Sequence, residues 1–125
     1  MFEFFSWAAK KTRGRAAAPG VNEEFGIEVE PTPITAGDTV TVKYNGLLAK
    51  NGARQIYLHA GYGDNRAWQE VRDVPMRKVG ANTWLAELPV GTNTRLNFCF
   101  RDDADHWDNN NGLNWSYEVH DGILT

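Results

Sequence analysis

Apolar and polar residues alternate in several short stretches of this chain, and this period of two constrains the fold more than any other feature. In TVTVKY, Val40, Val42 and Tyr44 fall on one face of an extended chain, while the threonines and lysine between them fall on the other. Such alternation is typical of a β-strand with one buried face. RQIYLHAG, NTWLAELP, RLNFCF and WSYEVH show the same pattern. Their predicted inward residues are Ile56, Leu58, Trp84, Ala86, Leu88, Leu96, Phe98, Phe100, Trp115, Tyr117 and Val119.

Turn-forming residues separate these stretches. Glycine, asparagine and aspartate recur between them, as in Asn45-Gly46, Asn51-Gly52 and the segment 61–65. No long helical pattern competes with the strands. Six or seven short strands in a chain of 125 residues predict one all-β domain, an antiparallel immunoglobulin-like β-sandwich.

The N-terminal residues differ from the rest of the chain. Aromatic residues come first, a basic cluster follows, and AAAPG then leads into the alternating region. We therefore expect residues 1–21 to form a flexible aromatic and basic tail, and residues 22–125 to form the β-sandwich domain. A secretory signal has its basic residues before its apolar residues, which is the reverse of this order. The predicted location is therefore the cytoplasm.

Charge and cysteine content exclude several classes of function. Thirteen Lys and Arg against 16 Asp and Glu give a net charge of −3, without the basic excess of an electrostatic nucleic-acid binder. No apolar run approaches the roughly 18 residues of a membrane span. Cys99 is the single cysteine, and no Cys or His residues have the spacing of a metal site. We expect no nucleic-acid partner, no membrane span, no metal and no cofactor.

The five tryptophans divide into two groups. Trp84 and Trp115 belong to alternating inward sets, so we expect them in the core. Trp68 and Trp107 lie in polar loops, outside any such set, and His59 falls on the outward face of its strand. These three rings have no predicted place in the core. We therefore expect His59, Trp68 and Trp107 to form one exposed surface.

The stretch HWDNNNG places an indole beside an acid and three side-chain amides. A glucose ring exposes C–H groups on its faces and hydroxyls around its rim. An aromatic plane suits the face, while Asn, which both donates and accepts hydrogen bonds, suits the rim. This combination indicates sugar recognition of weak affinity, because the costs of association consume most of the energy of stacking.

The residues that carry these features also carry a family resemblance. YLHAGYG, then a tryptophan followed by VPMRK, then TWLAELPV and LNFCFRDDADHWDNNNGLNW occur in this order. Together they resemble the starch-binding carbohydrate-binding modules of families 25 and 53, over about residues 39–119. Within them, FxFRDxxxxWDNNxG is fairly specific. Such modules usually accompany amylases or synthases.

The resemblance implies a β-sandwich that binds α-1,4-linked glucans (starch, glycogen or malto-oligosaccharides) without catalysis. It implies stacking of sugars on His59, Trp68 and Trp107, and hydrogen bonds from Asn109 and Asn110. We expect Asp108 to hold the loop by capping backbone amides. The expected partner is an α-glucan, and a glucan-active enzyme is a further candidate partner.

Three alternatives stay open. The acids Asp102, Asp103, Asp105 and Asp108 could supply a glycosidase pair, although hydrolysis needs two carboxylates at a set separation that a sequence does not give. The segment DDADHWDNNNG is rich in oxygen ligands but lacks the glutamate of the calcium-binding helix-loop-helix template, so only a different calcium site would fit. In the third alternative, the sandwich and the N-terminal tail form a protein interaction or targeting module without significant sugar binding.

Overall fold

The alternating stretches form the long strands of the protein. The computed structural model describes residues 21–22, 25–91 and 94–121; apart from Val21, the predicted tail lies outside them. The five predicted strands are all present. They are β4 (Thr39–Tyr44), β5 (Ile56–Tyr62), β8 (Trp84–Pro89), β9 (Arg95–Asp102) and β11 (Trp115–His120).

Shorter elements and one edge strand complete the described chain. They are β1 (Val21–Asn22), β2 (Ile27–Glu30), β3 (Ile34–Thr35), α2 (Leu47–Lys50), β6 (Gln69–Pro75), β7 (Arg77–Lys78) and β10 (Trp107–Asp108). The described residues thus contain more strands than the six or seven predicted, because four of these strands have only two residues.

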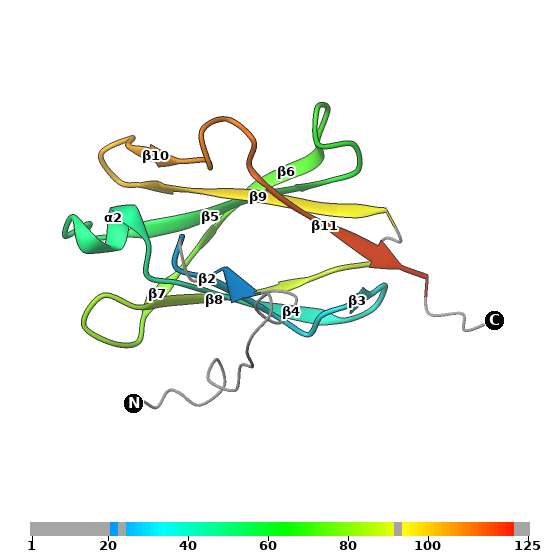
Figure 1. Ribbon diagram of the computed structural model, residues 1–125, viewed down its shortest axis with the longest axis horizontal. Helices are drawn as coiled ribbons and strands as arrows, with labels where there is room; N and C mark the ends of the chain where they lie inside the picture. The colour runs from blue at the N-terminus through cyan, green and yellow to red at the C-terminus, as the bar shows by residue number, and fades with distance from the viewer. Residues whose placement is uncertain (1–20, 23–24, 92–93, 122–125) are drawn as a thin grey trace.

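The strands form two layers, which confirms the predicted all-β sandwich (Figure 1). The first sheet has the order β1-β2-β4-β8-β7, and the second has the order β3-β11-β9-β5-β6, with β10 paired to β9. The described pairings are antiparallel except that of β3, which runs parallel to β11. The helix α2 lies at one end of the sandwich (Figure 1).

The core lies between the two sheets and includes the predicted inward residues. All of them are buried except Tyr117, which is partly buried and packs against the core. Tyr44 from the first sheet stacks on Phe100 from the second, with 3.9 Å between the ring centroids. Each fully buried large apolar side chain contributes about 1.5–3 kcal/mol. The buried stripes on the two sheets therefore hold the layers together.

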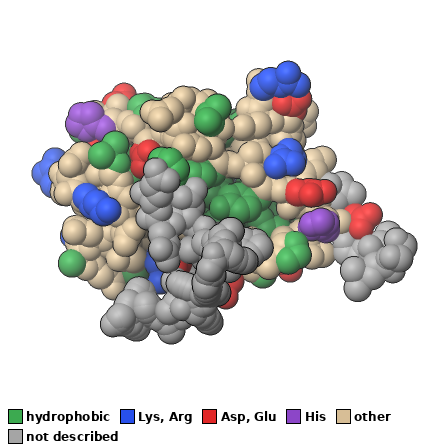
Figure 2. Space-filling view, viewed as in Figure 1, with side chains coloured by type: hydrophobic (Ala, Val, Ile, Leu, Met, Phe, Trp, Pro, Cys, Tyr) green, Lys and Arg blue, Asp and Glu red, His purple; other side chains and the backbone are tan. Residues whose placement is uncertain are grey.

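The outer face of the first sheet is polar. Lys43 pairs with Glu28 at 3.5 Å, and Arg77 pairs with Glu87 at 3.3 Å. Figure 2 shows basic side chains separated from one another on the face in view, rather than gathered into one patch. Within the described part of the chain, no helix has the length and apolarity needed to cross a membrane.

Candidate functional site

Three aromatic rings meet on the outer face of the second sheet. His59 lies on β5, Trp68 lies at the end of the β5–β6 loop, and Trp107 lies on β10. The centroid of the His59 ring is 5.7 Å from that of Trp68 and 5.1 Å from that of Trp107. We call these three residues the ring platform. The structure therefore brings together the three rings that the sequence assigned to the surface.

Strand register explains why His59 and Trp107 share this face. Residues directly opposite each other in an antiparallel pair point to the same side of the sheet. Trp107 lies opposite Arg101, which in turn lies opposite Tyr57, two residues before His59 on β5. The side chain of Trp107 stays 44% exposed, so the indole is available to a ligand.

Trp68 lies flat against the sheet because Gly61 leaves room for it. A Cβ atom added at Gly61 would lie 2.8 Å from Cβ and 3.0 Å from Cε3 of Trp68. A β-bulge at this place, with Glu70 at φ 56°, shifts the register between β5 and β6 beside the indole. The indole N–H donates to the backbone oxygen and to Oδ1 of Asn65, both at 2.9 Å. Trp68 is thus half-buried and fixed in orientation.

A chain of polar contacts fixes the imidazole of His59. Its Nδ1 lies 2.7 Å from Oδ1 of Asp73, and the other oxygen of Asp73 accepts hydrogen bonds from Arg101 at 3.1 and 3.3 Å. The Arg101 guanidinium lies over the ring of Tyr57, 4.5 Å from its centroid. Burial raises the pKa of Asp73, but the hydrogen bonds from Arg101 and His59 outweigh it and hold this pKa below its usual value. Asp73 therefore stays ionised and holds Nδ1, which leaves Nε2 for a ligand.

The predicted asparagines follow β10 in the chain and hold their own loop, and Asn110 lines a cavity with Phe25 and Leu47. We call residues 109–114 the asparagine loop. Oδ1 of Asn109 accepts the N–H of Gly112 at 3.0 Å, and Nδ2 of Asn110 donates to the carbonyl of Asn114 at 3.0 Å. Asn110, Asn111 and Asn114 adopt positive φ, a conformation that Asn tolerates better than most residues. Among the described residues, Nδ2 of Asn109 and Oδ1 of Asn110 keep no hydrogen-bond partner in the chain, so each amide has one group left for a ligand.

Asp108 holds the loop in a way that differs from the prediction. Its Oδ2 accepts the hydroxyl proton of Tyr44 at 2.6 Å, across the two sheets, and among the described residues it caps no backbone amide. The register gives the reason, because Asp108 lies opposite the inward-facing Phe100, on which Tyr44 stacks. Burial, followed by the bond to Asp108, raises the pKa of Tyr44 above its usual value. The hydroxyl therefore remains a proton donor.

Two buried or bridging amides tie the loops to the sheet. Asn65 Nδ2 donates to the carbonyl of Leu113 at 3.0 Å, which joins the Trp68 loop to the asparagine loop. Asn97 is fully buried; it donates to the carbonyl of Gly63 at 2.9 Å and accepts the hydroxyl of Ser116 at 2.6 Å. Both loops are therefore anchored before any ligand arrives, which lowers the entropy cost of binding.

The other acids of the segment make structural contacts. Asp102 is buried and accepts the backbone N–H groups of Ala104 and His106. Asp103 and Asp105 each lie 4.0 Å from an arginine. Within the residues that the structure describes, no group of three or more His, Cys, Asp or Glu side chains is placed to hold a metal ion.

The sequence reasoning missed the residues that support the platform: Gly61, Asn65, Asp73 and Arg101. Asp73 reaches His59 because the two residues lie opposite each other on paired strands. The pairing of strands is not visible in a single sequence, so neither Asp73 nor Arg101 could be found from it. Gly61 carried a usable signal. It ends the alternating stretch RQIYLHAG and lies within β5, and a glycine within a strand often marks a place where another group approaches closely.

Comparison with known proteins supports the resemblance. Residues 40–98 match the starch/carbohydrate-binding module of family 53. This segment contains His59 and Trp68 and ends before Trp107. An alpha-amylase of Clostridium acetobutylicum is 33% identical over 92 residues, which make up 73% of this chain but only 11% of that relative. No solved structure matches the chain. The predicted relationship to family 53 is confirmed, while no comparison tests the relationship to family 25.

Proposed function

Because residues 40–98 match the starch/carbohydrate-binding module of family 53, we propose that the protein binds α-1,4-linked glucans without catalysis. Glucose rings stack on His59, Trp68 and Trp107, and hydroxyls bond to the free amide groups of Asn109 and Asn110. The observation that carries this proposal is the ring platform, in which the rings of Trp68 and Trp107, from two other segments, lie 5.7 and 5.1 Å from the His59 ring, centroid to centroid.

The energetics of such a site favour weak, reversible binding. Covering about 100 Å² of apolar surface contributes about 2.5 kcal/mol before the costs of association, and those costs remove much of it. Because the rings and loops are anchored in advance, ordering them adds little to the cost. Starch, glycogen and malto-oligosaccharides all present the same ring faces, so we propose the α-1,4-linked glucans as a class.

The alpha-amylase relative supports a delivery role. The chain corresponds to a small part of that relative, as a module attached to a catalytic domain does. We propose that the module brings a glucan-active enzyme to its polymer.

Calorimetry with maltoheptaose tests the proposal, with cellohexaose as the comparison ligand. Both are linear glucose oligomers, and they differ in the linkage that sets the path of successive rings. Maltoheptaose should bind and cellohexaose should bind much more weakly. Equal affinity for the two would refute the α-glucan assignment, and release of reducing sugar from starch by the pure protein would refute the absence of catalysis.

A further inference from the structure

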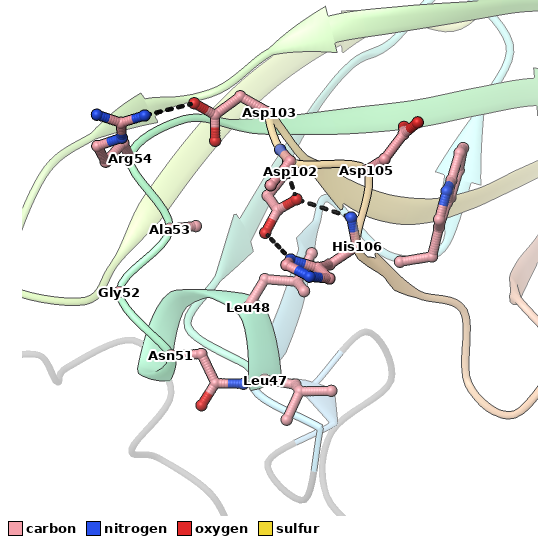
Figure 3. Close-up of a pocket in the computed structure, with 12 residues that line it drawn as sticks. Leu47, Leu48, Asn51, Gly52, Ala53, Arg54, Asp102, Asp103, Asp105 and His106 are labelled. Atoms are coloured by element: carbon pink, nitrogen blue, oxygen red, sulfur yellow. Dashed lines mark hydrogen bonds and ion pairs between the residues drawn. The ribbon is translucent and has the colours of Figure 1, made fainter.

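An open cleft lies beside the ring platform, beyond Trp107. Its volume is about 680 Å³, within the usual range of small-ligand sites of about 300–1,000 Å³. The connection from α2 to β5 forms one wall, and the turn between β9 and β10 forms the other (Figure 3). Trp107 lines the cleft and also belongs to the platform, so the two share this residue. Lining side chains include Leu47, Asn51, Arg54, Asp103, His106 and Trp107.

His106 is held in the cleft by a buried carboxylate. Its Nδ1 lies 3.0 Å from Oδ2 of Asp102, whose side chain is only 9% exposed (Figure 3). The other oxygen of Asp102 accepts the backbone N–H groups of Ala104 and His106, at 3.0 and 2.8 Å. The imidazole itself is 71% exposed. Among the described residues its Nε2 has no partner, so a fixed ring offers one polar atom to the cleft.

This arrangement repeats the one found at His59 in the platform. In both places an aspartate holds Nδ1 of an imidazole, at 2.7 Å for His59 and 3.0 Å for His106. The two imidazoles belong to different parts of the surface. The His59 ring lies 5.1 Å from that of Trp107 in the platform, and His106, which precedes Trp107 in the chain, lines the cleft.

We propose that the cleft is a second subsite, which takes further glucose units of the same glucan chain that lies on the platform. This inference rests on the proposed function. Leu47, which is 56% exposed, supplies an apolar surface for a sugar face. His106 Nε2 and the carboxylate of Asp103 accept hydroxyl protons, and the exposed guanidinium of Arg54 donates to hydroxyl oxygens. The cleft thus combines an apolar wall with donors and acceptors, as the platform does.

Chain length separates the two subsites in an experiment. Maltotriose has one glucose unit for each ring of the platform, whereas maltoheptaose is long enough to continue past Trp107. A longer chain also gains affinity simply by offering more overlapping positions to the platform. The comparison must therefore be between variants, with both ligands measured by calorimetry on each.

We expect His106→Ala and Asp103→Ala each to weaken maltoheptaose binding about threefold or more, the effect of one lost hydrogen bond, and to leave maltotriose binding unchanged. His120→Ala is the control for His106, because His120 is exposed at the far end of β11. Glu87→Ala is the control for Asp103, because it also removes one acid of an exposed pair with arginine. Both controls should bind the two sugars as the wild type does.

Chemical shifts of the wild-type protein give a readout that needs no substitution. The backbone amides of Leu48 and Ala53, which line the cleft, should shift with maltoheptaose and not with maltotriose. Unchanged amides, or variants that leave maltoheptaose binding intact or weaken both sugars equally, would overturn the second subsite while leaving the platform standing. Absence of binding of either sugar to the wild type would overturn the proposed function and this inference with it.

Discussion

Replacing Gly61 by alanine tests whether the packing of Trp68 against Gly61 governs glucan binding. The new Cβ would lie 2.8 Å from Cβ of Trp68 and 3.1 Å from Cγ2 of Val71. Carbon atoms pack best at about 3.5–4.0 Å, so the indole must move by about 0.7 Å or more. Its N–H bonds to Asn65 are 2.9 Å long, and a shift of this size takes them beyond hydrogen-bonding distance.

The expected cost divides between folding and binding. Overpacking destabilises by about 1–3 kcal/mol, and the smaller conformational entropy of unfolded alanine returns about 0.4–1 kcal/mol. The variant should therefore stay folded, with an unfolding free energy lower by up to about 2.5 kcal/mol. A displaced and loosened indole should weaken maltoheptaose binding by about fivefold or more, as expected for the loss of one hydrogen bond and part of a stacking contact.

Calorimetry and urea denaturation measure the two effects separately. Gly80→Ala is the matched control, because its new Cβ would meet its nearest neighbour, Thr83, at an ordinary 3.5 Å. If Gly61 acts through Trp68, the substitution should have no further effect on affinity in a Trp68→Ala background. If Gly61→Ala bound maltoheptaose with wild-type affinity, the role assigned to the packing of Trp68 against Gly61 would be refuted.

Three further predictions follow from the same contacts. Trp107→Ala should weaken glucan binding at least about tenfold in calorimetry. Trp84→Ala, at a buried core position, should chiefly lower the unfolding free energy, by about 3–5 kcal/mol. The reverse pattern would contradict the assignment of Trp107 to the platform and Trp84 to the core. Tyr44→Phe removes the donor to Asp108 and the acceptor of the Leu48 N–H, and should cost about 1–3 kcal/mol in urea denaturation; an unchanged midpoint would show that the cross-sheet bond is dispensable. The lowered pKa of Asp73 contributes folding stability that is complete above the usual carboxyl pKa of about 4. This contribution is lost as the pH falls through the pKa of Asp73 in the folded state. Between pH 6 and pH 3, Asp73→Asn should therefore lose less unfolding free energy than the wild type, and an equal loss would argue against this linkage.

The long strands were predictable because each is a local pattern with a simple cause. Val40, Val42 and Tyr44 alternate with polar residues, and an extended chain sends such a set to one side. Other elements depend on partners far along the chain. The strand β3 has only two residues and exists because Val119 and His120 of β11 lie beside it. Leu47–Lys50 forms one helical turn between two turn-forming pairs, where the Tyr44 hydroxyl accepts the N–H of Leu48.

The platform was predictable by elimination, since three rings had no place in an inward set. Its support was not predictable in the same way. Asp73 is one of several acids in the sequence, and only the register of β5 against β6 brings it to His59. For Asp108, a local rule gave the wrong partner. A loop aspartate usually caps nearby backbone amides, but pairing with Phe100 turns Asp108 inward, where it accepts the hydroxyl of Tyr44.

The asparagine loop has two requirements that compete for the same amides. Residues at positive φ need local hydrogen bonds to stay ordered, and a sugar needs free donors and acceptors. Asn109 commits its oxygen to Gly112, and Asn110 commits its nitrogen to Asn114. Among the described contacts, the side chain of Asn109 is thereby left with its amide nitrogen free, and that of Asn110 with its amide oxygen free. Asp cannot replace Asn109 in this scheme, because a carboxylate would hold the Gly112 N–H but would present an acceptor where the amide presents a donor. Asn109→Asp should therefore keep the loop folded and still weaken glucan binding, which separates the ligand role of this residue from its structural role.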